Sequence, residues 1–168
     1  GVRLVGSEMC IRDSFERITF GDPLLTTQQD HVEVVNAICQ EFSNLPADCA
    51  LILMGHGTSH YANDVYAALD YRFKDLGFSN IHLATVEGYP TLENVTRMVK
   101  EQEAKKVILA PFMIVAGDHA RNDMSGDDED SWKNQFRAAG YDVECRMKGL
   151  GEYPAIQDML IRHVTEVC

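Results

Sequence analysis

The sequence predicts an α/β fold with a mainly parallel sheet of about four strands, and two observations support this prediction. Apolar runs typical of buried strands alternate with stretches whose apolar residues recur at helical spacing. These units repeat about every 25 to 35 residues, which suits strands joined by right-handed helical crossovers. With 168 residues, 45% of them apolar, the chain can form one domain with its own core.

The expected elements follow one another in regular order. An alternating segment at 15–20 predicts a first strand, and Gly21-Asp22-Pro23 ends it. Thr26 or Thr27 is expected to cap a helix that continues to about Phe42. Further strands are expected at 50–54, 81–86, 107–112 and 141–147, and further helices at 60–76, 91–103, 130–139 and 154–167.

The composition excludes several classes of protein. The formal net charge of −11 provides no basic face for a nucleic acid and no attraction to an anionic membrane surface. No apolar run approaches the roughly 18–20 residues that a membrane span requires. The phosphate-binding motifs G-x-x-x-x-G-K-[ST] and G-x-G-x-x-G are absent, as are G-x-S-x-G and H-E-x-x-H. Neither a nucleotide cofactor nor serine hydrolysis is therefore expected.

The five cysteines favour a reducing compartment. Their number is odd, and none forms a C-x-x-C pair. A disulfide framework is not expected in a chain of this size, so the predicted location is the cytoplasm.

Three titratable residues follow three of the predicted strands, at the point where each strand ends. His56 follows the strand at 50–54, Glu87 follows 81–86, and His119 comes after the apolar run that ends at Val115. Open α/β sheets build their active sites at the carboxyl ends of their strands. We therefore expect these three side chains to converge.

The combination of residue types indicates a metal site. Each histidine alone would more often be a structural residue with satisfied hydrogen bonds, whereas a carboxylate at a buried strand end must be paired, bound to metal or near water. Two imidazoles and one carboxylate suit a first-row divalent metal with open positions. Ligand chemistry alone does not choose among cobalt, nickel, iron and zinc.

Neighbouring residues are candidates for supporting roles. Asp118 and Asp123 are expected to orient His119, because a metal-binding histidine usually donates its other N–H to such a group; ordinary loop capping is the alternative. Tyr89 and Pro90 either form a wall of the site or simply shape a turn. Arg121 lies near a strand end, where it could meet an acidic substrate.

Five stretches resemble the anaerobic cobalt chelatases of the class II chelatase superfamily, the sirohydrochlorin cobaltochelatases. These stretches are ITFGDPLL at 18–25, MGHGT at 54–58, VEGYP at 86–90, PFMIVAGDHARNDMSGD at 111–127 and DSW at 130–132. The resemblance runs from about Phe15 to the C-terminus, and the 111–127 string is long and specific.

The resemblance implies a fold and an organisation. The fold would be a three-layer chelatase-like domain equivalent to one half of a two-domain chelatase, with the active site in the cleft between the halves. Residues 1–14 are then a leader that is non-native or disordered, 15–26 the inter-domain connector, and 27–168 the C-terminal chelatase domain. A full member has about one more domain before Phe15, so we expect this chain to be truncated.

The resemblance also implies an activity, which is Co²⁺ insertion into the tetrapyrrole sirohydrochlorin, in anaerobic cobalamin biosynthesis and without a nucleotide. It makes His56, Glu87 and His119 the metal ligands. His119 or His56 would also act catalytically by accepting a pyrrole proton. The residues expected at the substrate are Gly88, Tyr89, Pro90 and Arg121.

Other interpretations remain open at this point. A non-catalytic protein that binds metal, haem or another tetrapyrrole could be built on the same fold. A metal-dependent hydrolase would keep the three ligands but lacks a clear second base. A homodimer is an alternative way to complete the cleft.

Overall fold

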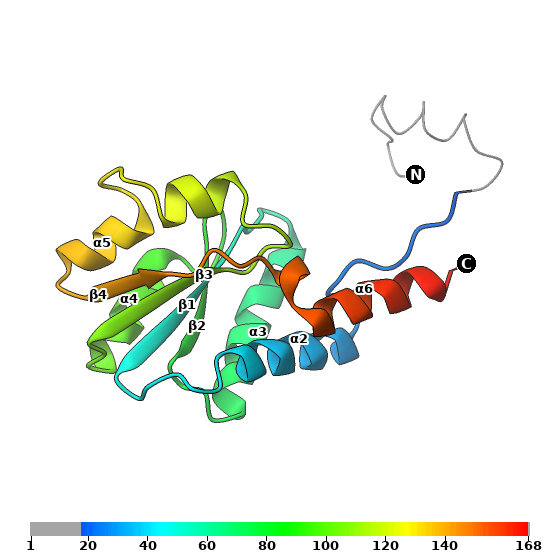
Figure 1. Cartoon of the computed structure of the whole chain (residues 1–168), viewed down its shortest axis with the longest axis horizontal. Helices are drawn as coiled ribbons and strands as arrows, with labels where there is room; N and C mark the ends of the chain where they lie inside the picture. Colours follow the sequence, from blue (N-terminus) through cyan, green and yellow to red (C-terminus); the bar gives the residue numbers. More distant parts are fainter. Residues whose placement is uncertain (1–17, 168) are drawn as a thin grey trace.

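A four-stranded, all-parallel sheet lies between two layers of helices in the computed structural model of the chain, which confirms the predicted fold class (Figure 1). The structure describes residues 18–167. The strand order is β2-β1-β3-β4, so the first strand is central. The strands are β1 (Cys49–Gly55), β2 (Ile81–Thr85), β3 (Lys106–Pro111) and β4 (Asp142–Cys145).

Strict alternation along the strands divides the core into two halves. Leu51 and Leu53 of β1 face α2, α3 and α6, whereas Ile52 and Met54 face α4 and α5. Every residue of β1 is buried, as expected for a strand covered on both faces. The α-helices are α2 (Gln28–Glu41), α3 (Asp64–Asp75), α4 (Leu92–Glu101), α5 (Trp132–Ala138) and α6 (Pro154–Thr165). Three short helical turns, η1 (Tyr61–Asn63), η2 (Ala120–Met124) and η3 (Leu150–Glu152), complete the elements.

Local sequence signals set the ends of several helices. Thr27 begins α2 with a capping box, in which its hydroxyl accepts from the backbone N–H of Asp30 and the Asp30 carboxylate accepts from the N–H of Thr27. Thr91 caps α4 through Asn94 in the same way. Gly77 and Gly140 follow α3 and α5 with positive φ, the conformation that glycine adopts at helix ends.

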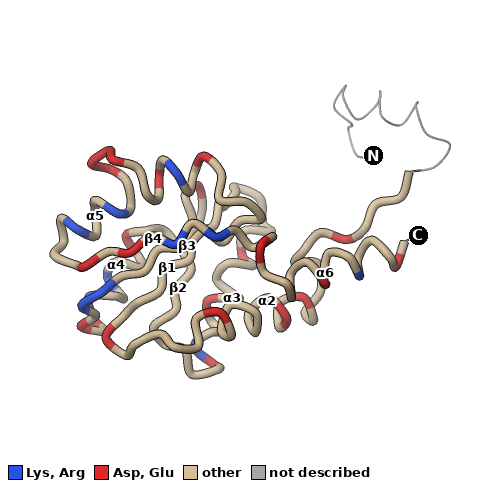
Figure 2. Tube along the Cα trace, in the orientation of Figure 1, with Lys and Arg blue, Asp and Glu red and all other residues tan. Residues whose placement is uncertain are grey.

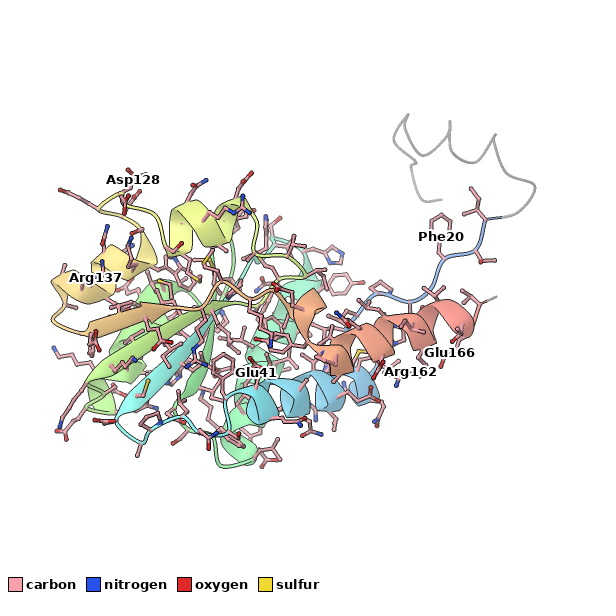
Figure 3. The ribbon with its side chains drawn as sticks, in the orientation of Figure 1. Phe20, Glu41, Asp128, Arg137, Arg162 and Glu166 are labelled. Carbon is pink, nitrogen blue, oxygen red and sulfur yellow. The ribbon has the colours of Figure 1, made fainter. Side chains whose placement is uncertain are left out.

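The predicted strand at 15–20 is wrong for the residues that the structure describes. Residues 18–20 belong to no strand, and Phe20 is exposed. The chain here runs beside α6, and Gly21 lies so close that a Cβ atom would come within 2.7 Å of the His163 carbonyl oxygen (Figure 3). The alternation of apolar and polar residues gave a wrong prediction here, because the pattern does not show whether a neighbouring strand is available to pair with. Residues 1–14 lie outside the described part, as do residues 15–17 of the connector expected at 15–26. The leader and the connector both remain predictions.

Candidate metal centre

The strand order changes direction between the two central strands. From β1 the chain moves to β2 on one side, whereas from β3 it moves to β4 on the other. Open α/β sheets bind their ligands where the order reverses in this way. His56 follows β1 directly, and His119 comes after β3, so the two predicted ligands flank this point.

The structure brings the three predicted ligands together. The imidazole rings of His56 and His119 meet edge to face, with their centroids 4.7 Å apart. Glu87 Oε2 lies 3.9 Å from His56 Nδ1, and both of these side chains are about half exposed. Within residues 18–167, no three His, Cys, Asp or Glu side chains form a ready-made metal cluster. The three groups are thus adjacent and open to solvent, and they would have to rotate to hold one ion together.

In both imidazoles, a hydrogen bond at Nδ1 orients the ring and leaves Nε2 for a ligand. His56 Nδ1 lies 2.8 Å from the carbonyl oxygen of Gly57, and His119 Nδ1 lies 2.5 Å from a carboxylate oxygen of Asp123. Both partners are acceptors, so each Nδ1 carries the proton and donates it. The lone pair of each neutral ring is then on Nε2, which is the state that a metal ligand requires.

His119 is held by a short helical turn that the sequence analysis did not predict. It precedes η2, whose residues Ala120 and Met124 are buried in the core beside α5. Asp123 lies four residues after His119, and residues at this spacing share one face of a helix. Asp118 is exposed, and the described residues include no side-chain hydrogen bond from it to His119. Of the two candidate aspartates, the structure therefore pairs Asp123 with the imidazole.

The turn after β1 requires two glycines for different reasons. A Cβ atom at Gly55 would lie 2.3 Å from the ring of Tyr66. Gly57 has φ +81°, and a Cβ there would lie 2.7 Å from the backbone nitrogen of Gly88. Positive φ and close backbone approach both favour glycine. The loop that carries His56 can therefore lie directly against the loop that carries Glu87.

Four exposed apolar side chains lie at the same end of the sheet as the three predicted ligands. Tyr61 and Tyr89 come after β1 and β2, and Ile114 and Val115 come after β3, so the four residues form an exposed apolar rim at the carboxyl ends of these strands. Tyr89 is 60% exposed, whereas Pro90 is buried and its carbonyl accepts hydrogen bonds from Thr85. The structure thus places Tyr89 at the surface of this rim and Pro90 inside the turn.

Some basic residues near the strand ends are held in salt bridges, whereas Arg121 is available to bind a substrate. Arg146 pairs with Glu144, and Lys148 with Glu41. Arg121 is exposed, and within residues 18–167 it forms no salt bridge. The acidic run 127–130 is an exposed loop between η2 and α5 (Figure 2).

Sequence reasoning missed two residues that shape the site. Asn63 is buried and hydrogen-bonds both to Thr58 and to Tyr89, while the hydroxyl of Tyr66 lies 3.4 Å from the backbone nitrogen of Gly57. An asparagine before a helix resembles an ordinary N-cap, and a tyrosine within a helix resembles a core residue. The sequence pattern therefore could not show that these two side chains contact the loops of the site.

A parallel sheet between helical layers, with two imidazoles and a carboxylate at neighbouring strand ends, defines a domain of the class II chelatase type. A solved multi-domain protein from Deinococcus radiodurans, described as similar to chelatases but with two additional novel domains, has the same fold. It superposes with a TM-score of 0.55 at 18% sequence identity, over 80% of this chain and 29% of that one.

The chain belongs to the cobalt chelatase (CbiK) family, whose model matches residues 4–168. It is 38% identical over 162 residues to a sirohydrochlorin cobaltochelatase of Salmonella typhimurium. It is also 33% identical over 157 residues to the sirohydrochlorin cobaltochelatase CbiKC of Nitratidesulfovibrio vulgaris. These alignments cover 96% and 91% of this chain but only 61% and 54% of the relatives, so the chain spans a little over half of their length.

Proposed function

We propose that this domain carries the metal-handling half of a chelatase that inserts Co²⁺ into sirohydrochlorin. The observation that supports this most strongly is the meeting of the His56 and His119 rings, 4.7 Å apart, beside Glu87 in a member of the cobalt chelatase family. Co²⁺ is a substrate here, so the three ligands must bind it and also release it. Half-exposed side chains that are not locked into a closed tetrahedron suit that requirement.

The proposed reaction exchanges one cation for two protons. Sirohydrochlorin gives up its two pyrrole N–H protons, one to an imidazole of the site and one to water, and receives Co²⁺ in their place. As the ion leaves an imidazole, the Nε2 lone pair that held it becomes free to accept a pyrrole proton. His119 is the better acceptor of the two, because its Nδ1–H donates to the Asp123 carboxylate, which stabilises the resulting imidazolium, whereas His56 donates to a neutral carbonyl.

The proposal extends to the surroundings of the ligands. The apolar rim of Tyr61, Tyr89, Ile114 and Val115 would contact a face of the macrocycle, and Arg121 would meet one of its carboxylates. No nucleotide is required, and Co²⁺ rather than Ni²⁺, Fe²⁺ or Zn²⁺ is the proposed metal. A cytoplasmic location accords with Cys39, Cys49 and Cys145, which are free thiols in the described part of the chain.

The test follows sirohydrochlorin absorbance after Co²⁺ is added, with this chain alone and with the chain joined to the N-terminal part of the Salmonella relative. Metallation in either form, lost in His119→Ala but retained in His60→Ala, is the expected result. His60 is an exposed histidine of the same rim that caps η1 and serves as the matched control. Full turnover by His119→Ala would overturn the proposed role. Co²⁺ binding without turnover in both forms would instead favour a non-catalytic binder.

A further inference from the structure

Asn63 joins the two loops that carry His56 and Glu87. Its Oδ1 accepts a hydrogen bond from the backbone N–H of Thr58 at 3.0 Å, and its Nδ2 donates to the carbonyl of Tyr89 at 2.6 Å. Thr58 lies two residues after His56, and Tyr89 lies two residues after Glu87. One buried amide therefore spans two segments that are far apart in the sequence.

The helix that follows does not use this side chain. Asn63 is the N-cap residue of α3, the position where an asparagine ordinarily accepts a hydrogen bond from the first turn. Here it makes no such bond. The Asn63 side chain makes its hydrogen bonds to the two loops instead. The helix thereby lacks a cap that would stabilise it by about 1 kcal/mol.

The packing around the amide leaves little room for movement. A Cβ atom at Gly88 would lie 2.2 Å from Asn63 Oδ1, so the glycine next to Glu87 lies directly against the amide. On the strand side, backbone bonds join the same loops, since Val86 N–H donates to Gly55 and Glu87 N–H donates to His56. The loops are thus tied on both sides of the ligand pair.

We propose that Asn63 is a positioning residue of the metal centre, whose amide sets the separation between His56 and Glu87. The proposal rests on the proposed role of these two residues as metal ligands. An amide is required because one partner is a donor and the other an acceptor, and the two bonds must be made from one short side chain. Without the Asn63 amide, the two loops would keep the backbone hydrogen bonds between them. They would lose the link between Thr58 and Tyr89 that fixes their spacing.

Asn80 offers a matched control at the opposite end of the same strands. Its Nδ2 donates to the carbonyl of Cys49 at 2.8 Å and lies 3.4 Å from that of Pro46, so it also links two segments across the sheet. It lies where β1 and β2 begin, away from the ligands. Its loss should affect stability in a similar manner without affecting the metal.

The experiment titrates CoCl₂ into the chain, follows the visible absorbance of bound Co²⁺, and measures urea unfolding of each variant. Asn63→Ala is expected to weaken Co²⁺ binding about tenfold or more, as loss of a group that orients metal ligands does. Asn80→Ala is expected to stay within about twofold of the parent, since distant sites act independently. Asn63→Ser keeps a small polar side chain at a position that α3 does not use as a cap, yet it cannot bridge both loops, so it should fold and still show the weaker binding.

Parallel titration of His56→Ala separates this proposal from the one on which it rests. If His56→Ala loses Co²⁺ binding while Asn63→Ala and Asn63→Ser bind as tightly as Asn80→Ala, the positioning role is overturned and the metal centre stands. If His56→Ala itself binds Co²⁺ normally, the metal centre is wrong, and the role of Asn63 falls with it. Weak binding in both Asn63 variants and in His56→Ala supports both proposals.

Discussion

The imidazoles of His56 and His119 are oriented by hydrogen bonds to the groups behind them. His119 donates to Asp123, and His56 donates to the carbonyl of Gly57, so both rings keep Nε2 for a ligand. A carboxylate is the stronger of these partners, because a charged acceptor roughly doubles the strength of a hydrogen bond. Asp123 is therefore the more consequential of the two supports.

Replacing Asp123 with Asn should weaken Co²⁺ binding by about 10- to 100-fold, because His119 would lose the charged group that fixes its orientation. Isothermal titration with CoCl₂ measures the effect. Asp128→Asn is the matched control, since Asp128 points outward from an exposed loop (Figure 3). Equal affinities for the two variants would contradict the assignment of Asp123 as the support of His119.

Arg121 is expected to act on substrate binding and not on the metal. Its replacement by Ala should raise the KM for sirohydrochlorin by about fivefold, the effect of losing an exposed ion pair worth about 1 kcal/mol. Arg137→Ala on α5 is the control (Figure 3). Steady-state kinetics in the metallating form of the protein test this, and a change in kcat alone would argue against a binding role.

At the scale of elements, the end of β1 shows how a strand delivers a ligand. The strand is buried throughout, and the turn after it brings His56 into solvent within a single residue. Gly57 allows this sharp turn because its φ of +81° is a conformation that glycine adopts readily. A side chain at this position would also collide with the backbone of Gly88. The loop after β2 then packs against this turn, and the two ligand-bearing segments become neighbours.

Gly57→Ala should therefore lower the free energy of unfolding by more than the backbone strain of a positive φ alone would. Gly77 also has positive φ, +88°, but a Cβ there would meet nothing within 4 Å. Gly77→Ala should lower the free energy of unfolding by about 1–2 kcal/mol, the cost of the left-handed conformation. Gly57→Ala should exceed that loss by at least about 1 kcal/mol because of the clash, and it should also weaken Co²⁺ binding. Urea unfolding and Co²⁺ titration of both variants give the comparison, and equal losses would be inconsistent with the packing described.

On the scale of the whole molecule, a buried pair of polar side chains, Asp30 and His163, joins α6 to α2 and to the segment before it. His163 Nε2 lies 3.0 Å from Asp30 Oδ1, and His163 Nδ1 lies 3.0 Å from the carbonyl of Asp22. Burial by itself would raise the pKa of Asp30, but hydrogen bonds from Thr27 and His163 lower it overall. Arg162 lies 3.7 Å from the same carboxylate and pairs with Glu33, so charges of both signs lie near Asp30.

The lowered pKa of Asp30 makes a prediction about acid stability. A carboxylate whose folded pKa is below its unfolded value stabilises the fold above the unfolded pKa, and this stability is lost as the pH falls through the folded value. Asp30→Asn should cost about 3 kcal/mol at pH 7, because the amide loses the negative charge and places an N–H donor against either the Thr27 N–H or His163 Nε2. This difference should shrink as the pH falls below about 4. Urea unfolding between pH 7 and pH 3.5 measures it. Asp75→Asn, at the exposed end of α3, should show no such dependence.

The fold was largely predictable because its signals are local. The continuous apolar run of β1, the Thr27 and Thr91 caps and the glycine at 77 each report the state of a few consecutive residues. The exceptions are equally local in origin. The segment at 15–20 alternates without a strand partner in its described part, and the turn of η2 after His119 has no periodicity long enough to recognise.

The sequence by itself determined the order of strands and helices and the three titratable residues at successive strand ends. Only the tertiary structure decided that β1 lies between β2 and β3, so that His56, Glu87 and His119, which follow these strands, become neighbours. It also decided that Asn63 turns from its helix to join Thr58 with Tyr89. The reason is physical: periodicity reports which residues are buried, whereas strand neighbours and contacts across loops depend on packing between segments that are distant in the chain.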